Sequence, residues 1–223
     1  MKRISETGAL MIRMLVCLLF VTVSIEMIGE PLYAISAKDI VKQVQNKYKK
    51  TEDIQANLEE VFLWKLTQNQ DTLRGRIYLK KENFFRIETT TQIIVTDGKQ
   101  VWTYSPINNQ TVIDNFRSTE ETFLPQQFIF SFSKDYRAEL GGEEEIEGKK
   151  CYVLLLQPLK EHLIVKQAKV WIDNEWITRR VQYTDVNDNL TTFIFRNIQF
   201  NVKLKRELFK FESPSGTEII DMR

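Results

Sequence analysis

The stretch "IIVTDGKQVWTYSP" (residues 93–106) has the composition of a β-hairpin. Apolar and β-branched residues flank Asp97-Gly98, a dipeptide typical of two-residue turns between antiparallel strands. A turn at this dipeptide places Ile93 opposite Trp102, because the turn sets which residues pair across the two strands. Ile93, Trp102 and Tyr104 are then expected on one side of the sheet.

Segments on both sides of this hairpin continue the period of two. In "IQANLEEVFLWKL" (54–66) the even-numbered residues are apolar except Glu60, and "TLRGRIYLKK" repeats the alternation. Further strand-like segments are "FFRIETTTQIIVT", "KKCYVLLLQP", "IVKQAKVWI", "EWITRRVQYT" and "LTTFIFRNIQF". Short turns rich in Gly, Asn and Asp separate them, so neighbouring strands are expected to pair antiparallel. The sequence therefore predicts one large, curled antiparallel sheet.

An N-terminal helix is predicted for "SAKDIVKQVQNKYKK" (36–50). Ser36 and Asp39 have a spacing like that of a capping box, and Ile40, Val44 and Tyr48 form an apolar stripe at helical spacing. This helix can cover one side of the sheet.

A short helical hairpin is predicted for residues 118–133, which include the apolar stretch "FLPQQFIFSF". Capping signals precede it, and Pro125 can open its second helix. Its apolar side chains include Phe123, Leu124, Phe128, Ile129 and Phe132, and Leu124, Phe128 and Phe132 are spaced four residues apart. The strand "CYVLLLQ" (151–157) is apolar on both sides and must be covered twice. We therefore expect the hairpin to lie as a lid on the concave side of the sheet.

Residues 1–34 have the pattern of a signal peptide. A basic segment precedes the 12-residue apolar core "MLVCLLFVTVSI", and small residues follow near Ala34 and Ser36, after either of which cleavage is expected. A membrane-spanning helix needs about 20 apolar residues, so an uncleaved anchor is the less favoured alternative. Residues 35–223 then form a single domain.

The composition of the chain excludes several classes of partner and site. The net charge is +1, and residues 1–34 contain three basic and three acidic residues, so the remainder carries the same net charge and gives no support to nucleic-acid binding. After residue 34 the chain has one cysteine, Cys151, and one histidine, His162, so it can form no internal disulfide.

The sequence contains no recognisable catalytic motif. It lacks a nucleophile elbow, a glycine-rich phosphate loop and a Cys/His metal spacing. Cys151 lies in an apolar strand and is expected to be inert, while His162 is expected in an exposed turn. The acidic segment "GGEEEIEGKK" (141–150) is expected to be a solvated hairpin tip, and "TRR" (178–180) exposed charge. An enzyme is therefore not expected, and no metal or cofactor is predicted.

Four motifs in order resemble the periplasmic outer-membrane lipoprotein carriers, the LolA-type family. They are "IQANLEE" (with Leu58 and Glu60 as substitutions), "YLKKENFFRI", "IIVTDGKQVWTYSP" and "FKFESPSGTEII". The resemblance covers nearly all of residues 35–223. It implies an open half-barrel of about eleven β-strands with helices as a lid over an apolar cavity.

The resemblance also implies a function. Carriers of this family work as monomers in the periplasm, where they take the acyl chains of lipoproteins released by an inner-membrane ABC transporter. They pass these lipidated proteins to an outer-membrane receptor, without a cofactor and without making or breaking a bond.

From the family and the pattern together we expect an acyl-chain-binding surface. Its residues are Phe62, Trp64, Phe85, Ile87, Trp102, Tyr104, Phe123, Leu124, Phe128, Ile129 and Phe132. The family commonly latches its lid with an arginine before a proline, and here these positions are Lys81 and Glu82. Lysine cannot reproduce the planar fork of arginine, so Lys81 and the nearby Arg86 are the candidates for a different latch.

Two alternatives remain open. A related module on the same fold can bind or sense another lipid, such as a glycolipid. A lipid-processing enzyme is the third possibility, and the missing nucleophile motif argues against it.

Overall fold

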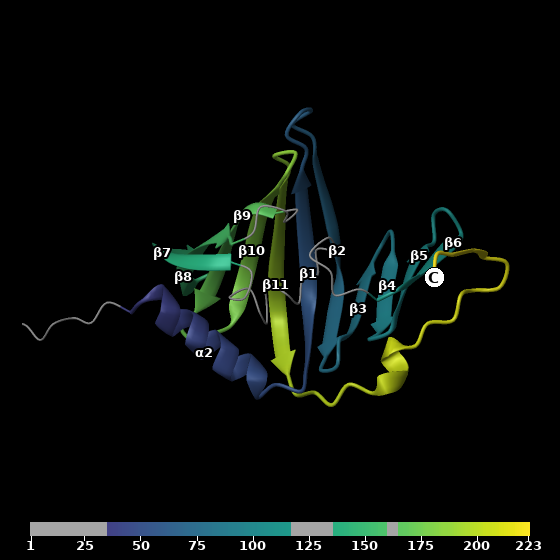
Figure 1. Cartoon of the computed structure of the whole chain (residues 1–223), viewed down its shortest axis with the longest axis horizontal. Helices are drawn as coiled ribbons and strands as arrows, with labels where there is room; N and C mark the ends of the chain where they lie inside the picture. Colours follow the sequence, from purple (N-terminus) through teal and green to yellow (C-terminus); the bar gives the residue numbers. More distant parts are fainter. Residues whose placement is uncertain (1–34, 117–135, 160–164) are drawn as a thin grey trace, which may run out of the picture. The chain divides into compact units, whose positions relative to one another are not determined.

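The computed structural model describes residues 35–116, 136–159 and 165–223. Residues Met1–Ile35 and Ser36–Arg223 are two separate units, and the fold below is that of the second unit. Among its described residues are one α-helix, α2 (Ala37–Lys49), one short 3-10 helix, η2 (Arg206–Phe209), and a sheet of 12 strands (Figure 1). No helix in the described part of the chain is long and apolar enough to cross a membrane.

Most of the strands follow one another along the chain with short connections; the two long connections are 116–135, between β6 and β7, and 201–217, between β11 and β12. They are β1 (Asp53–Leu63), β2 (Gln70–Lys80), β3 (Phe84–Thr89), β4 (Ile93–Asp97), β5 (Gln100–Ser105), β6 (Gln110–Asn115), β7 (Tyr136–Ile146), β8 (Lys149–Pro158), β9 (Val165–Asp173), β10 (Thr178–Asp185), β11 (Leu190–Phe200) and β12 (Glu218–Asp221).

The sheet is open, curled and almost entirely antiparallel, which confirms the predicted fold class. Its order is β12-β6-β5-β4-β3-β2-β1-β11-β10-β9-β8-β7, so β1 lies beside β11 near the middle. The twelfth strand, β12, pairs parallel to β6, with Ile219 opposite Thr111. About eleven strands were expected, and the additional one comes from the C-terminal segment.

Helix α2 forms as its sequence predicts. The Ser36 side chain accepts a hydrogen bond from the Asp39 N–H, and the Asp39 side chain accepts one from the Ser36 N–H. The stripe Ile40, Val44 and Tyr48 is buried.

The last residue of that stripe, Tyr48, shows which side of the sheet α2 covers. Its ring lies 6.0 Å from that of Phe200, and its Oη accepts a hydrogen bond from the Thr178 N–H. Phe200 pairs with Ile54 of β1. Paired residues of antiparallel strands point to the same side, so α2 lies on the side that carries Ile54, here called the helix face.

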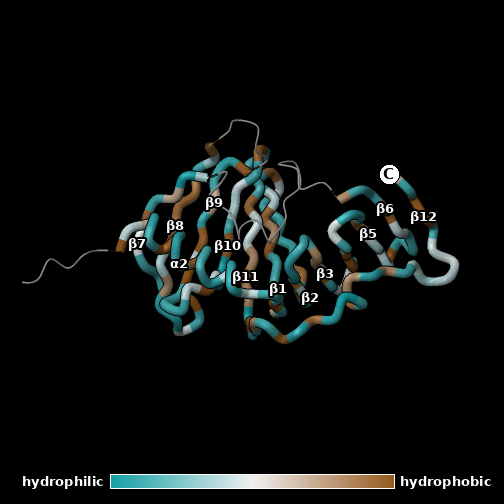
Figure 2. The backbone as a smooth tube through the Cα atoms, turned by 60° about the horizontal axis from the view of Figure 1, so that its bottom comes forward, coloured by the Kyte–Doolittle hydropathy of each residue, from teal (hydrophilic) through white to brown (hydrophobic). Residues whose placement is uncertain are grey.

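The helix face is apolar from β3 to β8. The pairing registers place on it a set of residues that are nearly all buried. They are Ile54, Ala56, Leu58, Ile77, Leu79, Phe85, Ile87, Leu154, Leu156, Ala168, Val170, Val181, Phe193 and Phe195. The alternation of hydrophobic and hydrophilic residues along the central strands is visible in Figure 2.

The opposite face of β1, β2 and β11 is charged. Glu59 accepts hydrogen bonds from Arg74 at 2.7 Å and from Arg196 at 3.4 Å, and Arg196 also pairs with Glu147 at 2.6 Å. The two faces of the central strands are therefore chemically distinct, as the period of two predicts.

The C-terminal segment 201–217 covers the opposite face of β3–β5. The fully buried Phe209 lies 5.6 Å from the Phe84 ring, and Phe211 lies 5.8 Å from the Tyr104 ring. Figure 1 shows this yellow segment running from the end of β11 to β12. It thereby gives the half of the sheet distant from α2 a core of its own.

Two details of the predicted hairpins are wrong. "FFRIETTTQIIVT" is not one strand but two, because the Thr89 hydroxyl accepts the Thr91 and Gln92 N–H groups and holds a turn between β3 and β4. In the next hairpin Ile93 faces Tyr104 rather than Trp102. The turn is centred one residue later than predicted, with Gly98 at φ 83° as its first central residue, which suits a type II′ turn. This shifts the pairing by two residues, so Ile93, Trp102 and Tyr104 still share one side.

The strand β8 is buried on both sides, as predicted. Leu154 and Leu156 lie on the helix face, and Cys151 and Val153 on the other. On that other side they pack against Ile146 and Trp171. The lid that was expected to cover one side of this strand lies outside the described residues, so that expectation stays a prediction.

Candidate functional site

The helix face is the candidate binding surface. Three of the predicted acyl-contact residues lie on it: Phe62 on β1, and Phe85 and Ile87 on β3. Phe85 is buried and its ring lies 6.4 Å from Phe116, the last described residue before the predicted lid. These three residues therefore belong to the apolar surface of the helix face.

Trp102 and Tyr104 lie on the opposite face, which corrects the expectation that they share a surface with Phe85. Trp102 pairs with Val95, and Val95 with Arg86, whose neighbour Phe85 points to the other side. Segment 201–217 supplies the ring that packs on Tyr104. The prediction that Ile93, Trp102 and Tyr104 share one side of the sheet was right. The sequence did not show that this side is the face opposite to the helix face.

Trp64 and Leu66 lie beyond the end of β1, in the turn to β2, although the pattern extended the strand through them. Trp64 contacts Phe62 edge-on, with ring centroids 4.6 Å apart. Its indole Nε1 donates to Asp71 Oδ2 at 3.2 Å. Trp64 thus extends the apolar surface beyond the end of β1.

The predicted lid residues lie outside the described part of the chain. These are Phe123, Leu124, Phe128, Ile129 and Phe132. The apolar cavity expected beneath them stays a prediction.

Both candidate latch residues have partners among the described residues. Lys81 Nζ pairs with Glu52 Oε1 at 2.5 Å. Arg86 lies on the opposite face, pairs with Glu88 Oε1 at 2.6 Å and donates to the Leu208 carbonyl at 3.3 Å. Arg86 therefore ties the C-terminal segment to β3, and a contact of either residue with the predicted lid stays a prediction.

Glu60 introduces a carboxyl group into the helix face. It lies between Leu73 on β2 and Phe193 on β11, and burial raises the pKa of its carboxyl. Burial likewise raises the pKa of Tyr183, which lies on β10 on the same face, 6.3 Å from the Phe193 ring. The sequence pattern marked Glu60 only as an interruption of the apolar face.

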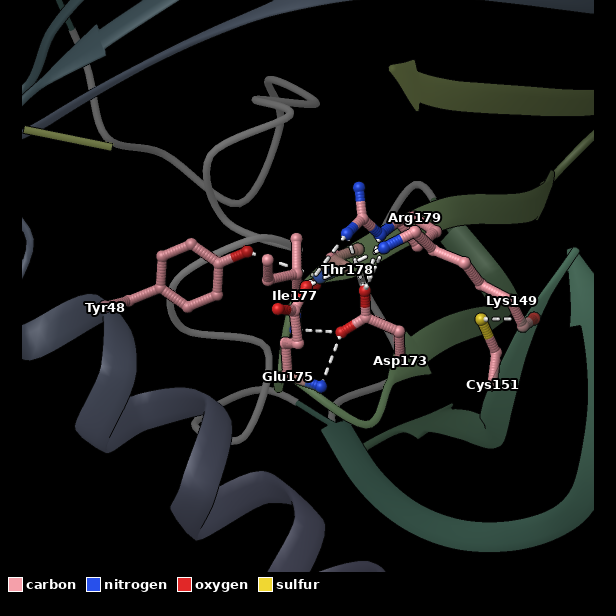
Figure 3. A network of polar contacts seen from close by, with 8 residues as sticks. All are labelled: Tyr48, Lys149, Cys151, Asp173, Glu175, Ile177, Thr178 and Arg179. Atoms are coloured by element: carbon pink, nitrogen blue, oxygen red, sulfur yellow. Dashed lines mark hydrogen bonds and ion pairs between the residues drawn. The ribbon is translucent and has the colours of Figure 1, made fainter. Parts of the chain in front are cut away.

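A polar network lies where β9 turns into β10 (Figure 3). The buried Asp173 accepts hydrogen bonds from the Arg179 side chain and from the Ile177 N–H. Arg179 is therefore mostly buried in an ion pair, which corrects the expectation of exposed charge at 178–180. Arg179 also pairs with Glu175 at 3.6 Å, so these ion pairs lie within the turn that joins β9 to β10.

The described residues include no assembled catalytic or metal site. Cys151 is buried, and that burial raises the pKa of its thiol. His162, its conceivable partner, lies outside the described residues. No cluster of His, Cys, Asp and Glu within 35–116, 136–159 and 165–223 is placed to hold a metal ion. The acidic segment 141–150 is exposed apart from Ile146, as predicted, but most of it is not a hairpin tip: 141–146 belong to β7 and 149–150 to β8, and the turn is Glu147-Gly148.

Comparisons with known proteins agree with this geometry. A family model described as "Outer membrane lipoprotein carrier protein LolA" matches residues 49–212. An outer-membrane lipoprotein carrier protein of Pasteurella multocida is 26% identical over 188 residues, which are 83% of this chain and 88% of that protein. An uncharacterized protein of Methanocaldococcus jannaschii is 26% identical over 189 residues, and the matched part spans 54% of its length.

Among solved structures, one with a similar fold illustrates the likeness. It is an uncharacterized conserved protein of Thermus thermophilus, with a TM-score of 0.56 and 15% sequence identity. The similarity covers 83% of this chain and 98% of that one.

Proposed function

Because the chain belongs to the LolA family of outer-membrane lipoprotein carrier proteins, we propose that its helix face binds the acyl chains of lipoproteins. The protein then carries them through the periplasm from the inner to the outer membrane. An inner-membrane lipoprotein-releasing transporter supplies the cargo and an outer-membrane receptor accepts it. Residues 1–34 direct export as a signal peptide, and residues 35–223 are the carrier.

The single observation that supports this proposal is the asymmetry of the central strands. On β1, Leu58 is buried on the helix face, while its neighbour Glu59 lies among arginines on the other. An open sheet with one apolar and one charged face can shelter a lipid on one side and remain hydrated on the other. The family membership states which kind of lipid to expect there.

The physical requirement is an apolar shelter for the chain. Hiding a 16-carbon acyl chain from water is worth on the order of 12 kcal/mol, at about 0.8 kcal/mol per CH₂ group. Transfer through water is therefore prohibitive without a carrier. A carrier that bound much more tightly than its receptor would not release its cargo, so a cover that competes with the lipid for the helix face is an advantage.

The test is the identity of the lipid that the protein retains. The protein is purified from the periplasm of its host, and the molecules bound to it are analysed by mass spectrometry. We expect acylated lipoprotein. A free glycolipid would replace the proposal by a glycolipid-binding module, and hydrolysis of acyl esters by the pure protein would replace it by an enzyme.

Depletion of the protein in cells provides a second readout. Lipoproteins should accumulate at the inner membrane if the protein is their carrier. Unchanged lipoprotein distribution, in cells where no second carrier is present, would contradict the proposal.

A further inference from the structure

The turn between β1 and β2 exposes two large apolar side chains. Leu66 is 95% exposed and Trp64 is 47% exposed. Single exposed apolar residues are common on protein surfaces, but a tryptophan and a leucine together at the tip of a long hairpin are not needed by the fold. Figure 1 shows this tip projecting beyond the neighbouring strands.

A second hairpin tip, the turn between β10 and β11, lies beside the first. The Lys65 N–H donates to Asn189 Oδ1 at 3.1 Å and joins the two turns. The second turn presents Val186, which is 52% exposed. The two tips together, residues 64–69 and 186–189, are here called the tip pair.

Internal hydrogen bonds satisfy part of the backbone of the first turn. The Trp64 N–H donates to the Asn69 carbonyl, the Gln68 N–H to the Trp64 carbonyl, and the Asn69 N–H to the Thr67 hydroxyl. The Gln68 side-chain amide donates to the Lys65 carbonyl. Unsatisfied backbone groups make an irregular loop costly in the hydrocarbon core. The turn therefore suits the interfacial layer, where water and headgroups can bind the backbone groups of Leu66 and Thr67.

The polar groups around the tip pair are also paired. Asp188 accepts a hydrogen bond from Lys166 at 2.7 Å, and the resulting ion pair lowers the pKa of the Asp188 carboxyl. Asp71 accepts the indole N–H of Trp64. The carboxylates beside the apolar side chains therefore already have partners, which reduces the cost of bringing them to a membrane surface.

The apolar side chains of the tip pair continue into the helix face. Trp64 packs edge-on against Phe62. Phe62 lies on the helix face, two residues after Glu60 on the same side of β1. A chain of apolar contact thus leads from the exposed tip onto the surface proposed to bind acyl chains.

We propose that the tip pair inserts into the interfacial layer of a lipid bilayer and docks the protein there. Trp64 lies at the headgroup level, where tryptophan is favoured, and Leu66 enters the acyl region. The docking itself follows from the tip pair alone. That lipid chains pass between the bilayer and the helix face along Trp64 and Phe62 rests on the proposed carrier function.

A bilayer fits this surface better than a protein partner does. Three separate side chains on two narrow turns provide far less contact than the roughly 800 Å² per partner typical of a stable protein interface. Asp188 pairs with Lys166, and the Lys65 side chain, between Trp64 and Leu66, can extend its charge to the headgroups. The main attraction is therefore apolar, and anionic lipid is not required.

The test is co-sedimentation of the purified protein with protein-free vesicles of phosphatidylcholine, with and without phosphatidylglycerol. We expect binding to both, and an affinity at least about tenfold lower for Leu66→Glu. The matched control is Ile107→Glu, because Ile107 is 75% exposed in the turn between β5 and β6, and this change should leave binding unchanged. Quenching of Trp64 by brominated lipid, absent in Trp64→Phe, reports insertion directly.

The outcomes separate this inference from the carrier function. Equal vesicle binding by the parent protein, Leu66→Glu and Ile107→Glu would overturn the docking proposal, as would no binding by the parent. Binding only with phosphatidylglycerol would replace it by an electrostatic contact. Leu66→Glu should retain a fluorescent fatty acid in vesicle-free solution as well as the parent protein does. A parent protein that retains no fatty acid would count against the carrier function and not against the docking proposal.

Discussion

Arg179 directs both its Nε and its Nη2 at one oxygen of Asp173, at 2.7 Å and 2.6 Å. The side chain of Asp173 is 0% exposed and that of Arg179 is 14% exposed. The other carboxylate oxygen accepts the N–H groups of Glu175 and Ile177 at 2.9 Å and 3.0 Å. One buried carboxylate therefore holds the turn between β9 and β10 and needs the guanidinium to neutralise it (Figure 3).

Arg179→Met should destabilise the protein by about 3 kcal/mol, because the buried Asp173 charge then keeps only the Lys149 ammonium, 3.9 Å away, as an ionic partner. The free energy of unfolding from urea titration measures this change. The Asp173→Asn/Arg179→Met double variant keeps the acceptor for the turn and removes both charges, so it should recover part of the loss. A double variant less stable than Arg179→Met alone would contradict this account.

A close approach between β2 and β3 depends on Gly75. A Cβ atom at this position would lie 1.8 Å from the backbone carbonyl oxygen of Glu88, which cannot move without disturbing the strand pairing. Gly75→Ala should therefore destabilise the protein by about 2 kcal/mol or more, measured by urea titration. Thr72→Ala, at an exposed position of the same strand, should cost about 1 kcal/mol or less. Equal effects of the two changes would show that the approach is adjustable.

The period of the apolar residues was sufficient to predict the elements of the fold. The residues Ile40, Val44 and Tyr48 lie on one side of the chain only if it is helical. The alternation in β1 required one buried apolar face and one hydrated polar face. The pairing of β12 with β6 could not be predicted, because a four-residue strand has too few positions for a period.

The placement of individual side chains was less predictable because it depends on segments distant in the sequence. Tyr104 is covered by Phe211, and residues 201–217 have no periodic pattern that indicates where they lie. Arg179 has the alternation of an exposed strand residue, and only the fold of the turn brings it to Asp173. The family resemblance likewise could not show that Trp102 and Phe85 lie on opposite faces.

Glu59 and Glu60 should respond to pH with opposite signs, since they are neighbours on opposite faces of β1. Burial raises the pKa of Glu60, so the folded protein keeps that proton where the unfolded chain has lost it. Its contribution to stability therefore falls as pH rises above the ordinary value of 4.5. The hydrogen bond from Arg74 lowers the pKa of Glu59, whose contribution is present above 4.5 and is lost as pH falls.

Urea titrations between about pH 3 and pH 7 of Glu59→Gln and Glu60→Gln test this pair. Relative to the parent, Glu60→Gln should gain stability as pH rises, and Glu59→Gln should lose it. Parallel curves for the two variants would mean that Glu60 is solvated in the folded protein, and would remove it from the apolar face.

Phe62 and Val61 allow the two faces to be compared at adjacent residues of similar burial. Phe62 lies on the helix face and Val61 on the opposite face, and both are partly exposed, so a charge at either position should leave the protein folded. Phe62→Glu should weaken binding of a fluorescent fatty acid about tenfold or more, because the carboxylate interrupts the apolar surface. Val61→Glu should bind as the parent does. If both variants bind equally well, with circular dichroism spectra like that of the parent, the acyl chain does not lie on the helix face near Phe62.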